Sequence, residues 1–282
     1  MSGFTAACLQ LTSDREVAPN IAAVRDLARR ARDRGADLIM TPEVTDMLES
    51  RRDAMLAKAQ PESEHAMLAA AREIARETGA WFLLGSAVVK LPDDQRVANR
   101  SFLIASDGSI AARYDKIHMF DVDLEKGESY RESKSFRPGE TAVLADLPWG
   151  KLGMTICYDL RFADLYRALA LRGASFLSIP SAFTVPTGRA HWHVLIRARA
   201  IENFCFVFAP AQSGEHANGR KTYGHSLIVA PWGEILAEAE DGAGLITAAI
   251  DPARVAEARR AVPSLAHDRP FTSPAASAVA AE

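Results

Sequence analysis

The stretch 153–162 places a single cysteine where a buried strand is expected to end. Residues 152–156 form an apolar run, and residues 162–171 show the spacing of an amphipathic helix. Cys157 lies between the two, so its thiol is expected at the carboxyl edge of a sheet, beside the free N–H groups of a helix start. Such groups favour negative charge on a thiolate or an oxyanion. Cys157 is therefore a candidate nucleophile, although a cysteine that only packs is the commoner case.

Two ionisable residues of complementary chemistry, Glu43 and Lys116, also follow expected strands. Glu43 comes after the buried run 36–40, and Lys116 comes after the run 109–114. In α/β proteins the carboxyl ends of strands meet at one edge of the sheet, where ligands bind. There a glutamate can take the proton of a thiol and hand it to a leaving amine, and a lysine can stabilise an oxyanion. Taken singly, Glu43 could cap a loop and Lys116 could be a solvated charge, so it is their joint occurrence with Cys157 that indicates an active site.

Predicted strands and helices alternate along most of the chain. We expect helices at about 20–34, 64–78, 162–171, 189–201 and 255–260, and buried strands between them, one of which spans 223–230. Buried strands separated by helices predict an α/β fold with a largely buried sheet. Residues 44–61 have a less regular pattern, and the polar stretch 115–140 is interpreted as a long loop.

The composition is that of a globular protein and excludes several functional classes. The chain has 282 residues, of which 48% are hydrophobic and 24% charged. Its net charge of −3 leaves no basic surface for nucleic acid and gives no reason to expect a membrane partner. No Pro/Gly-rich linker or internal repeat divides the chain. We therefore expect one domain over residues 1–271, followed by a mobile tail over 272–282 that is rich in Ala and Ser.

The use of cysteine indicates a reducing compartment. Cys8, Cys157 and Cys205 are widely spaced and form no Cys-x-x-Cys pair, which argues against a disulfide framework and against a zinc site. No apolar stretch is long enough to span a bilayer, and the N-terminal residues lack the basic segment of a signal peptide. We therefore expect a cytoplasmic protein.

Several separated motifs together resemble the nitrilase superfamily of carbon–nitrogen hydrolases. They are Thr-Pro-Glu at 41–43, Tyr-Asp-Lys-Ile-His at 114–118, Gly-Met-Thr-Ile-Cys-Tyr-Asp at 153–159, and a further element, Arg-Glu-Ser, at 131–133. They occur in the order found in that superfamily, and the similarity extends from the first strand to about residue 270. The resemblance implies a four-layer α-β-β-α sandwich and a homodimer in which the layers continue across the interface.

The resemblance also implies a role for each matching residue. Cys157 corresponds to the nucleophile, Glu43 to the general base and Lys116 to the lysine that stabilises the oxyanion. Glu132 corresponds to a second glutamate that orients the lysine and the substrate, and the backbone N–H of Tyr158 completes the oxyanion hole. The implied reaction is amide hydrolysis through a thioester, which requires no metal and no organic cofactor.

Within the superfamily, residues 157–162 resemble the branch that contains the omega-amidases and the deaminated-glutathione amidases, which hydrolyse amides of small dicarboxylic acids. Arg161 can bind a carboxylate with two parallel hydrogen bonds and so select acidic substrates. The structural alternative for Arg161 is an ion pair with Asp159 or Asp164. By resemblance, Thr187 binds the same substrate carboxylate.

Two strings favour one substrate of this branch. Ala-Gln-Ser-Gly-Glu-His at 211–216 and Tyr-Gly-His-Ser at 223–226 are more similar to deaminated-glutathione amidases than to omega-amidases. We therefore predict deaminated glutathione as the substrate, with α-ketoglutaramate or another small amide as the alternative. The larger substrate needs a more open pocket, and residues 214–221 are expected to line its opening.

Two rival hypotheses come from other classes of protein. In a Cys-His-Glu glutaminase, His191, His193 or His225 would act as the base in place of Glu43. If Glu43 is the base, His191 and His193 are interpreted as residues that pack the helix or form the pocket wall. A non-enzymatic interaction scaffold is the second rival, but such a scaffold has no need of a thiol, a base and a cation together.

Overall fold

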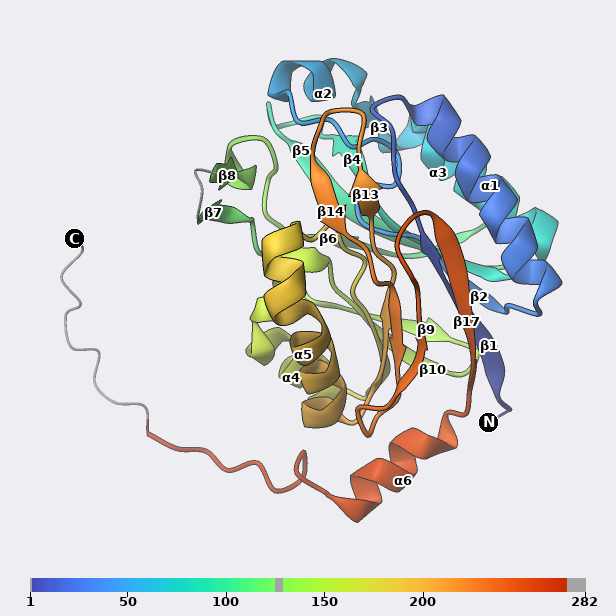
Figure 1. The fold of residues 1–282 in the computed structure, drawn as a ribbon. Coiled ribbons are helices and arrows are strands. Elements are labelled where there is room, and N and C mark those ends of the chain that lie inside the picture. Colours follow the sequence, from blue (N-terminus) through green and yellow to red (C-terminus); the bar gives the residue numbers. More distant parts are fainter. Residues whose placement is uncertain (1, 125–128, 273–282) are drawn as a thin grey trace.

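Two large mixed sheets form the centre of the molecule (Figure 1). The computed structural model describes residues 2–124 and 129–272. The first sheet has the order β17 (Gly244–Ile250), β1 (Phe4–Gln10), β2 (Leu38–Met40), β4 (Trp81–Lys90), β5 (Val97–Ile104) and β6 (Ile110–Asp115), with β3 (Gln60–Pro61) paired to β4. The second sheet has the order β16 (Ile235–Glu238), β15 (Leu227–Val229), β12 (Phe206–Ala209), β11 (Ala174–Ser178), β10 (Gly150–Met154) and β9 (Val143–Leu147).

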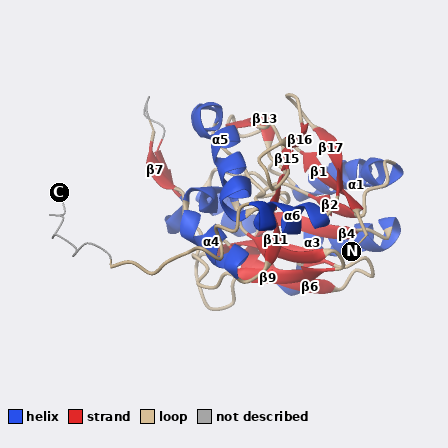
Figure 2. Cartoon of the chain, turned by 90° about the horizontal axis from the view of Figure 1, so that it is seen from below, coloured by secondary structure: helices blue, strands red, loops and turns tan. Residues whose placement is uncertain are grey.

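A pair of helices covers the outer face of each sheet. Helices α1 (Val17–Asp33) and α3 (Ala66–Thr78) pack on the first sheet, and α4 (Ala163–Leu171) and α5 (Val185–Asn203) pack on the second. In Figure 2 the strands lie between α1 on one side and α4 and α5 on the other. The predicted four-layer α-β-β-α sandwich is therefore confirmed. Two shorter helices, α2 (Arg52–Lys58) and α6 (Ala253–Ala261), lie outside these layers.

Strand β1 illustrates how the sequence specifies two buried faces. Its side chains alternate between two cores, with Phe4, Ala6 and Cys8 in the core between the sheets, and Ala7 and Leu9 in the core below α1 and α3. Because both faces of the strand are covered, its sequence is a nearly continuous apolar run.

Strand directions bring four chain segments to the same edge. Strands β1, β2 and β4 are mutually parallel, as are β10, β11 and β12. Strand β6 is antiparallel to β5, which is itself antiparallel to β4, so β6 runs in the same direction as β2. The residues that follow β2, β6, β10 and β11 can therefore meet at one end of the sandwich, as expected for a ligand site in an α/β protein.

Several predicted boundaries were wrong. Helix α5 begins at Val185 rather than at residue 189. The strand predicted at 223–230 is two strands, β14 (Lys221–Tyr223) and β15, because Gly224 and His225 have positive φ values of 72° and 57° and turn the chain. β14 instead pairs with β13 (Ser213–Glu215) in a hairpin.

The two segments predicted to lack regular structure also contain short elements. Helix α2 lies within 44–61, and the stretch 115–140 contains β7 (Asp121–Asp123), β8 (Ser129–Arg131) and the 3₁₀ turn η3 (Glu132–Lys134). The predicted C-terminal tail lies outside the described residues from 273 onward. No helix in residues 2–124 and 129–272 combines the length and the apolar character needed to cross a bilayer.

Candidate active site

Four of the predicted residues line a single cavity at this end of the sandwich. Glu43, Lys116, Glu132 and Cys157 all contribute to its wall, and its volume is about 340 Å³. That volume lies in the usual range of small-molecule sites. The structure thus brings together residues that are up to 114 positions apart in the sequence, which is the separation of Glu43 from Cys157.

A tight turn after β2 directs the Glu43 carboxylate into the cavity. The next residue, Val44, has a φ of 48°, and its N–H donates to the Ser86 hydroxyl at 2.8 Å. The Thr45 hydroxyl donates to the Pro42 carbonyl at 2.7 Å and closes the turn. A positive φ is uncommon outside glycine and persists only where surrounding contacts enforce it. The backbone that carries Glu43 is therefore held in one conformation.

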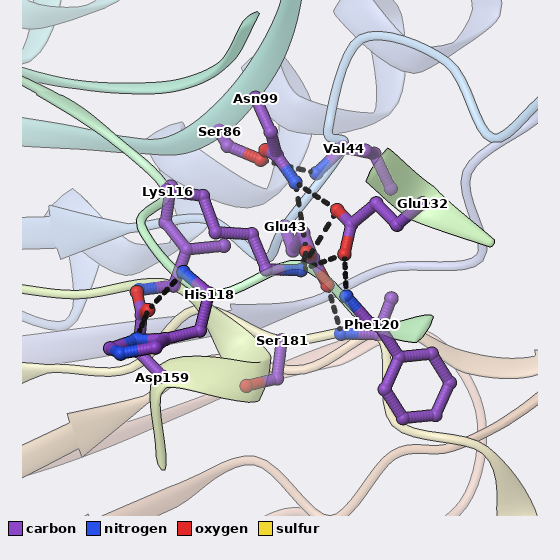
Figure 3. A network of polar contacts seen from close by, with 12 residues as sticks. Glu43, Val44, Ser86, Asn99, Lys116, His118, Phe120, Glu132, Asp159 and Ser181 are labelled. Carbon is purple, nitrogen blue, oxygen red and sulfur yellow. Dashed lines mark hydrogen bonds and ion pairs between the residues drawn. The ribbon is translucent and has the colours of Figure 1, made fainter. Parts of the chain in front are cut away.

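The Lys116 ammonium lies between two carboxylates (Figure 3). Its Nζ donates to Oε1 of Glu43 at 2.8 Å and to Oε1 and Oε2 of Glu132 at 2.9 Å each. Asn99 Nδ2 also donates to Oε1 of Glu43 at 2.9 Å and to Oε1 of Glu132 at 3.3 Å. The second Glu43 oxygen accepts from the N–H of Ala182 at 3.0 Å. Lys116 is only 2% exposed, so this network is shielded from solvent and its electrostatic interactions are strong.

Burial and neighbouring charges set the protonation of three groups. Burial raises the pKa of the Glu43 carboxyl, but the charge and hydrogen bond of Lys116 outweigh it and hold the pKa below its usual value. Burial lowers the pKa of the Lys116 ammonium, but Glu132 and Glu43 outweigh it and hold the pKa well above its usual value. Burial and the charge of Glu43 raise the pKa of the Cys157 thiol well above its usual value. At neutral pH the site therefore holds a carboxylate, an ammonium and a neutral thiol.

Cys157 begins the 3₁₀ turn η4 (Cys157–Arg161), which follows β10. Its φ of 49° is a left-handed value, and its N–H donates to the Pro180 carbonyl at 2.9 Å. Its relative exposure is 8%, and the residue lines the cavity. The predicted direct change from strand to helix is thus a 3₁₀ turn, and α4 starts only at Ala163.

The buried carboxylate of Asp159 holds η4 against the segment that follows β6. Its Oδ2 accepts from the N–H of Ile156 at 2.8 Å and from the Tyr114 hydroxyl at 2.7 Å. Its Oδ1 accepts from the N–H of His118 at 3.1 Å and lies 2.7 Å from His118 Nδ1 (Figure 3). Burial and the charge of Asp159 raise the pKa of Tyr114, so the phenol remains a donor. Asp159 therefore connects two of the segments that supply the site.

Two further predicted residues also line the cavity. Tyr158 is the second residue of η4, where N–H groups have no intrahelical partner, and its ring packs edge-on against Phe120 with centroids 5.1 Å apart. Thr187 lies in the first turn of α5, with its hydroxyl 2.8 Å from that of Thr184.

Arg161 lies outside the wall of the cavity. Its guanidinium carbon is 5.8 Å from the ring centroids of Tyr158 and of Phe183, both of which line the cavity, and its Nη2 is 3.3 Å from His191 Nδ1. The ion pair with Asp159 considered from the sequence does not form, because Asp159 binds His118 and Tyr114. Arg161 thus packs over two aromatic rings of the cavity wall and does not itself line the cavity.

Comparison with known proteins identifies the family. Residues 5–260 match the family model for carbon–nitrogen hydrolases. The chain belongs to the carbon–nitrogen hydrolase family. It is 39% identical to a deaminated glutathione amidase of Yersinia enterocolitica over 95% of this chain and 94% of that protein. It is 38% identical to the protein of the same name from Synechocystis sp. (strain PCC 6803 / GT-S), over 95% of this chain and 98% of that protein.

The structural comparison agrees with the family. Saccharomyces cerevisiae Nit3, a member of branch 10 of the nitrilase superfamily, has a similar fold with a TM-score of 0.83 at 28% identity, over 93% of this chain and 94% of that chain. The resemblance inferred from the motifs is therefore confirmed, and the protein is an amidase that acts on carbon–nitrogen bonds.

The histidines proposed as alternative bases lie elsewhere in this hydrolase. None of His191, His193 and His225 is among the described residues that line the cavity. His191 contacts Arg161, His193 Nε2 lies 2.8 Å from Oε1 of Glu238, and His225 Nδ1 lies 2.8 Å from the Tyr223 carbonyl. The geometry therefore favours Glu43 over a histidine as the base near Cys157.

Several residues of the hydrolase cavity were not predicted from the sequence. Asn99 was not singled out from the sequence, yet a polar amide within a buried strand is the signal that could have identified it. Residues 214–221 were expected at the opening, and Asn218 and Arg220 do line the cavity. Arg220 itself was not singled out, because its contacts with Ala182 and Tyr130 involve segments distant in the sequence.

Proposed function

We propose that this amidase hydrolyses deaminated glutathione at the amide between its α-ketoglutaryl group and its Cys-Gly half, with Cys157 as the nucleophile. The observation that carries the proposal is the Lys116 ammonium held between Glu43 and Glu132 in the same cavity as Cys157. A thiol, a base and a buried cation around one cavity are the groups that nucleophilic acyl transfer requires.

In the first half of the reaction, Glu43 accepts the proton of the Cys157 thiol as the sulfur attacks the amide carbon. Lys116 and the backbone N–H of Tyr158 stabilise the negative charge on the carbonyl oxygen. Collapse of the tetrahedral intermediate breaks the carbon–nitrogen bond. The leaving nitrogen takes the proton from Glu43, so the amine departs neutral and a thioester to Cys157 remains.

In the second half, a water molecule attacks the thioester and gives a proton to Glu43. The carbon–sulfur bond breaks, the sulfur of Cys157 recovers the proton, and the α-keto acid leaves. Glu132 keeps Lys116 oriented throughout, because its Oε2 also accepts from the N–H of Phe120 at 2.6 Å and is thereby fixed in place. Fixed donors are effective because they need no reorganisation as charge develops.

The choice of substrate rests on the relatives and on the cavity. The two relatives compared above are named deaminated glutathione amidases. The cavity extends from Cys157 to the hairpin loop that contains Asn218, so it offers room for more than a primary amide. We propose that Thr187 and Arg161 serve the carboxylate of the α-keto acid half. Arg161 packs over the rings of Tyr158 and Phe183 and does not line the cavity, so its side chain would have to move to contact that carboxylate directly.

A comparison of substrates tests this proposal. We expect kcat/KM for deaminated glutathione to exceed that for α-ketoglutaramate by about tenfold or more, since only the larger substrate uses the outer cavity. Both reactions can be followed by release of α-ketoglutarate, so a single coupled assay gives both values. A preference for α-ketoglutaramate, or for a neutral aliphatic amide, would assign the enzyme to a different substrate class.

We further propose a cytoplasmic homodimer in which residues 1–271 act as one domain. The cytoplasm is supported by three free cysteines. A dimer is supported by an apolar patch on α5 and on the turn between β15 and β16, formed by Val194, Ile201 and Trp232, which are 68%, 43% and 58% exposed. Val194 and Ile201 lie seven residues apart and so share one face of the helix.

A further inference from the structure

Arg220 differs from the other cations of the cavity because no carboxylate of the described residues forms an ion pair with it. Lys116 is paired with two glutamates, and Arg131 forms a two-oxygen ion pair with Asp123. Arg52 is exposed to solvent. Arg220 is half-buried, and no ion pair joins it to any acidic residue within 2–124 and 129–272.

The contacts of Arg220 fix its guanidinium and leave part of it without a partner. One terminal nitrogen, Nη2, donates to the Ala182 carbonyl at 2.6 Å, and the guanidinium carbon lies 5.6 Å from the ring centroid of Tyr130. Its Nε is buried and has no hydrogen-bond partner among the described residues. A buried donor without an acceptor is unfavourable, and a positioned guanidinium is well suited to a carboxylate. Because Arg220 also lines the cavity, an anion bound there can contact its guanidinium.

Arg220 lies on the side of the cavity where the leaving amine is expected. Ala182 links the two groups, because its N–H donates to Glu43 at 3.0 Å and its carbonyl accepts from Arg220. In the mechanism proposed above, Glu43 protonates the leaving nitrogen. The amine half of the substrate therefore extends from Glu43, and Arg220 is close enough to that carboxylate to favour its charged form.

We propose that Arg220 binds a carboxylate carried by the amine half of the substrate. The enzyme would then select amides whose leaving group is an amino acid or a short peptide over amides that release ammonia. This inference rests on the proposed function and deepens it, since it assigns the second carboxylate of the substrate to a residue. It also separates the two ends of the substrate, with Thr187 and Arg161 proposed for the α-keto acid half.

A matched pair of substrates tests the assignment. Deaminated glutathione is compared with its C-terminal carboxamide, which differs only in the charge at the glycine end. For the wild type, we expect kcat/KM to favour the acid by about tenfold to a hundredfold, the size of one charge-assisted hydrogen bond. In Arg220→Gln this acid-over-amide ratio should fall to near one. Arg220→Lys should retain an intermediate ratio, because lysine keeps the positive charge but lacks the paired N–H donors of a guanidinium.

The neighbouring Lys221 provides the control. It is exposed on the same hairpin and pairs with Glu215, so Lys221→Gln removes the same charge one residue away and should keep the wild-type ratio. The acid-over-amide ratio does not change when part of the enzyme is unfolded, because the measured rates for the two substrates then fall by the same factor. An unchanged ratio in Arg220→Gln would overturn the role of Arg220 while leaving the proposed function intact. A wild type that hydrolyses neither substrate would overturn the proposed function, and this inference with it.

Discussion

At the scale of single residues, the position of Lys116 between two carboxylates determines which protonation states are present at neutral pH. Lys116 stabilises the charged form of Glu43, and the charge of Glu43 in turn stabilises the protonated form of Cys157. The nucleophile is thus stored as a thiol beside an ionised base. A resting thiolate, as found in enzymes that pair cysteine with a cationic histidine, is not favoured here.

This arrangement predicts a broad pH profile. Activity requires ionised Glu43, whose pKa is lowered, so kcat/KM should fall only below the usual glutamate value of about 4.3. The pKa values of Cys157 and Lys116 are raised, so the alkaline decline should begin only above about 8.5. The profile is measured with an S-methylated substrate, which has no thiol to titrate. An inflection near the usual histidine pKa of about 6.5 would indicate a histidine base instead.

The role of Glu43 as a base predicts a large loss of activity in Glu43→Gln. This change keeps the shape of the side chain and removes its ability to accept a proton, so kcat/KM should fall by about a hundredfold or more. His193→Ala serves as the comparison, because His193 pairs with Glu238 away from the cavity and should retain most activity. Full activity in Glu43→Gln together with loss in a histidine variant would reverse our assignment.

Individual residues differed in how far the sequence alone could identify them. Glu43, Lys116 and Cys157 each follow an apolar run, so the direction of the preceding strand indicates where they lie. Glu132 lies in a polar stretch without a periodic pattern, and only the resemblance to a family identified it. The role proposed for Arg220 could not be predicted from the sequence. It depends on the lack of a hydrogen-bond partner for its Nε among the described residues, which only the folded structure shows.

At the scale of elements, the site depends on the junction between the end of β6 and the turn η4. Asp159 forms that junction, with four short contacts to Ile156, Tyr114 and His118. The sequence predicted the strands on either side from their periodicity. It did not predict the 3₁₀ geometry of η4 or the early start of α5, because both depend on tertiary contacts rather than on local propensity.

Asp159→Asn tests whether this junction positions the nucleophile. The amide would place an NH₂ group against donors that now face a carboxylate, so the free energy of unfolding should fall by about 1–3 kcal/mol. If the junction also orients Cys157, the kcat measured at a temperature well below the unfolding midpoint should fall, and KM should change less. Asp164→Asn, on the exposed first turn of α4, is the control. A variant that is destabilised but retains full kcat would limit Asp159 to a structural role.

At the scale of the whole molecule, the apolar patch of Val194, Ile201 and Trp232 predicts how two copies associate. The double change Val194→Glu/Ile201→Glu places two charges on this surface and should convert a dimer into a monomer, as measured by light scattering after size-exclusion chromatography. Val262→Glu changes another exposed apolar residue outside the patch and should leave the mass unaltered. A wild type that is already a monomer would contradict the proposed assembly.

The proposed reaction requires Cys157 as the nucleophile. The decisive measurement is kcat for deaminated glutathione in Cys157→Ala, with Cys205→Ala as a matched change at another buried free thiol. We predict that Cys157→Ala loses at least about 10⁴-fold in kcat, whereas Cys205→Ala remains within about tenfold of the wild type. If a correctly folded Cys157→Ala variant retained more than about a tenth of the wild-type kcat, the proposed thioester mechanism would be contradicted.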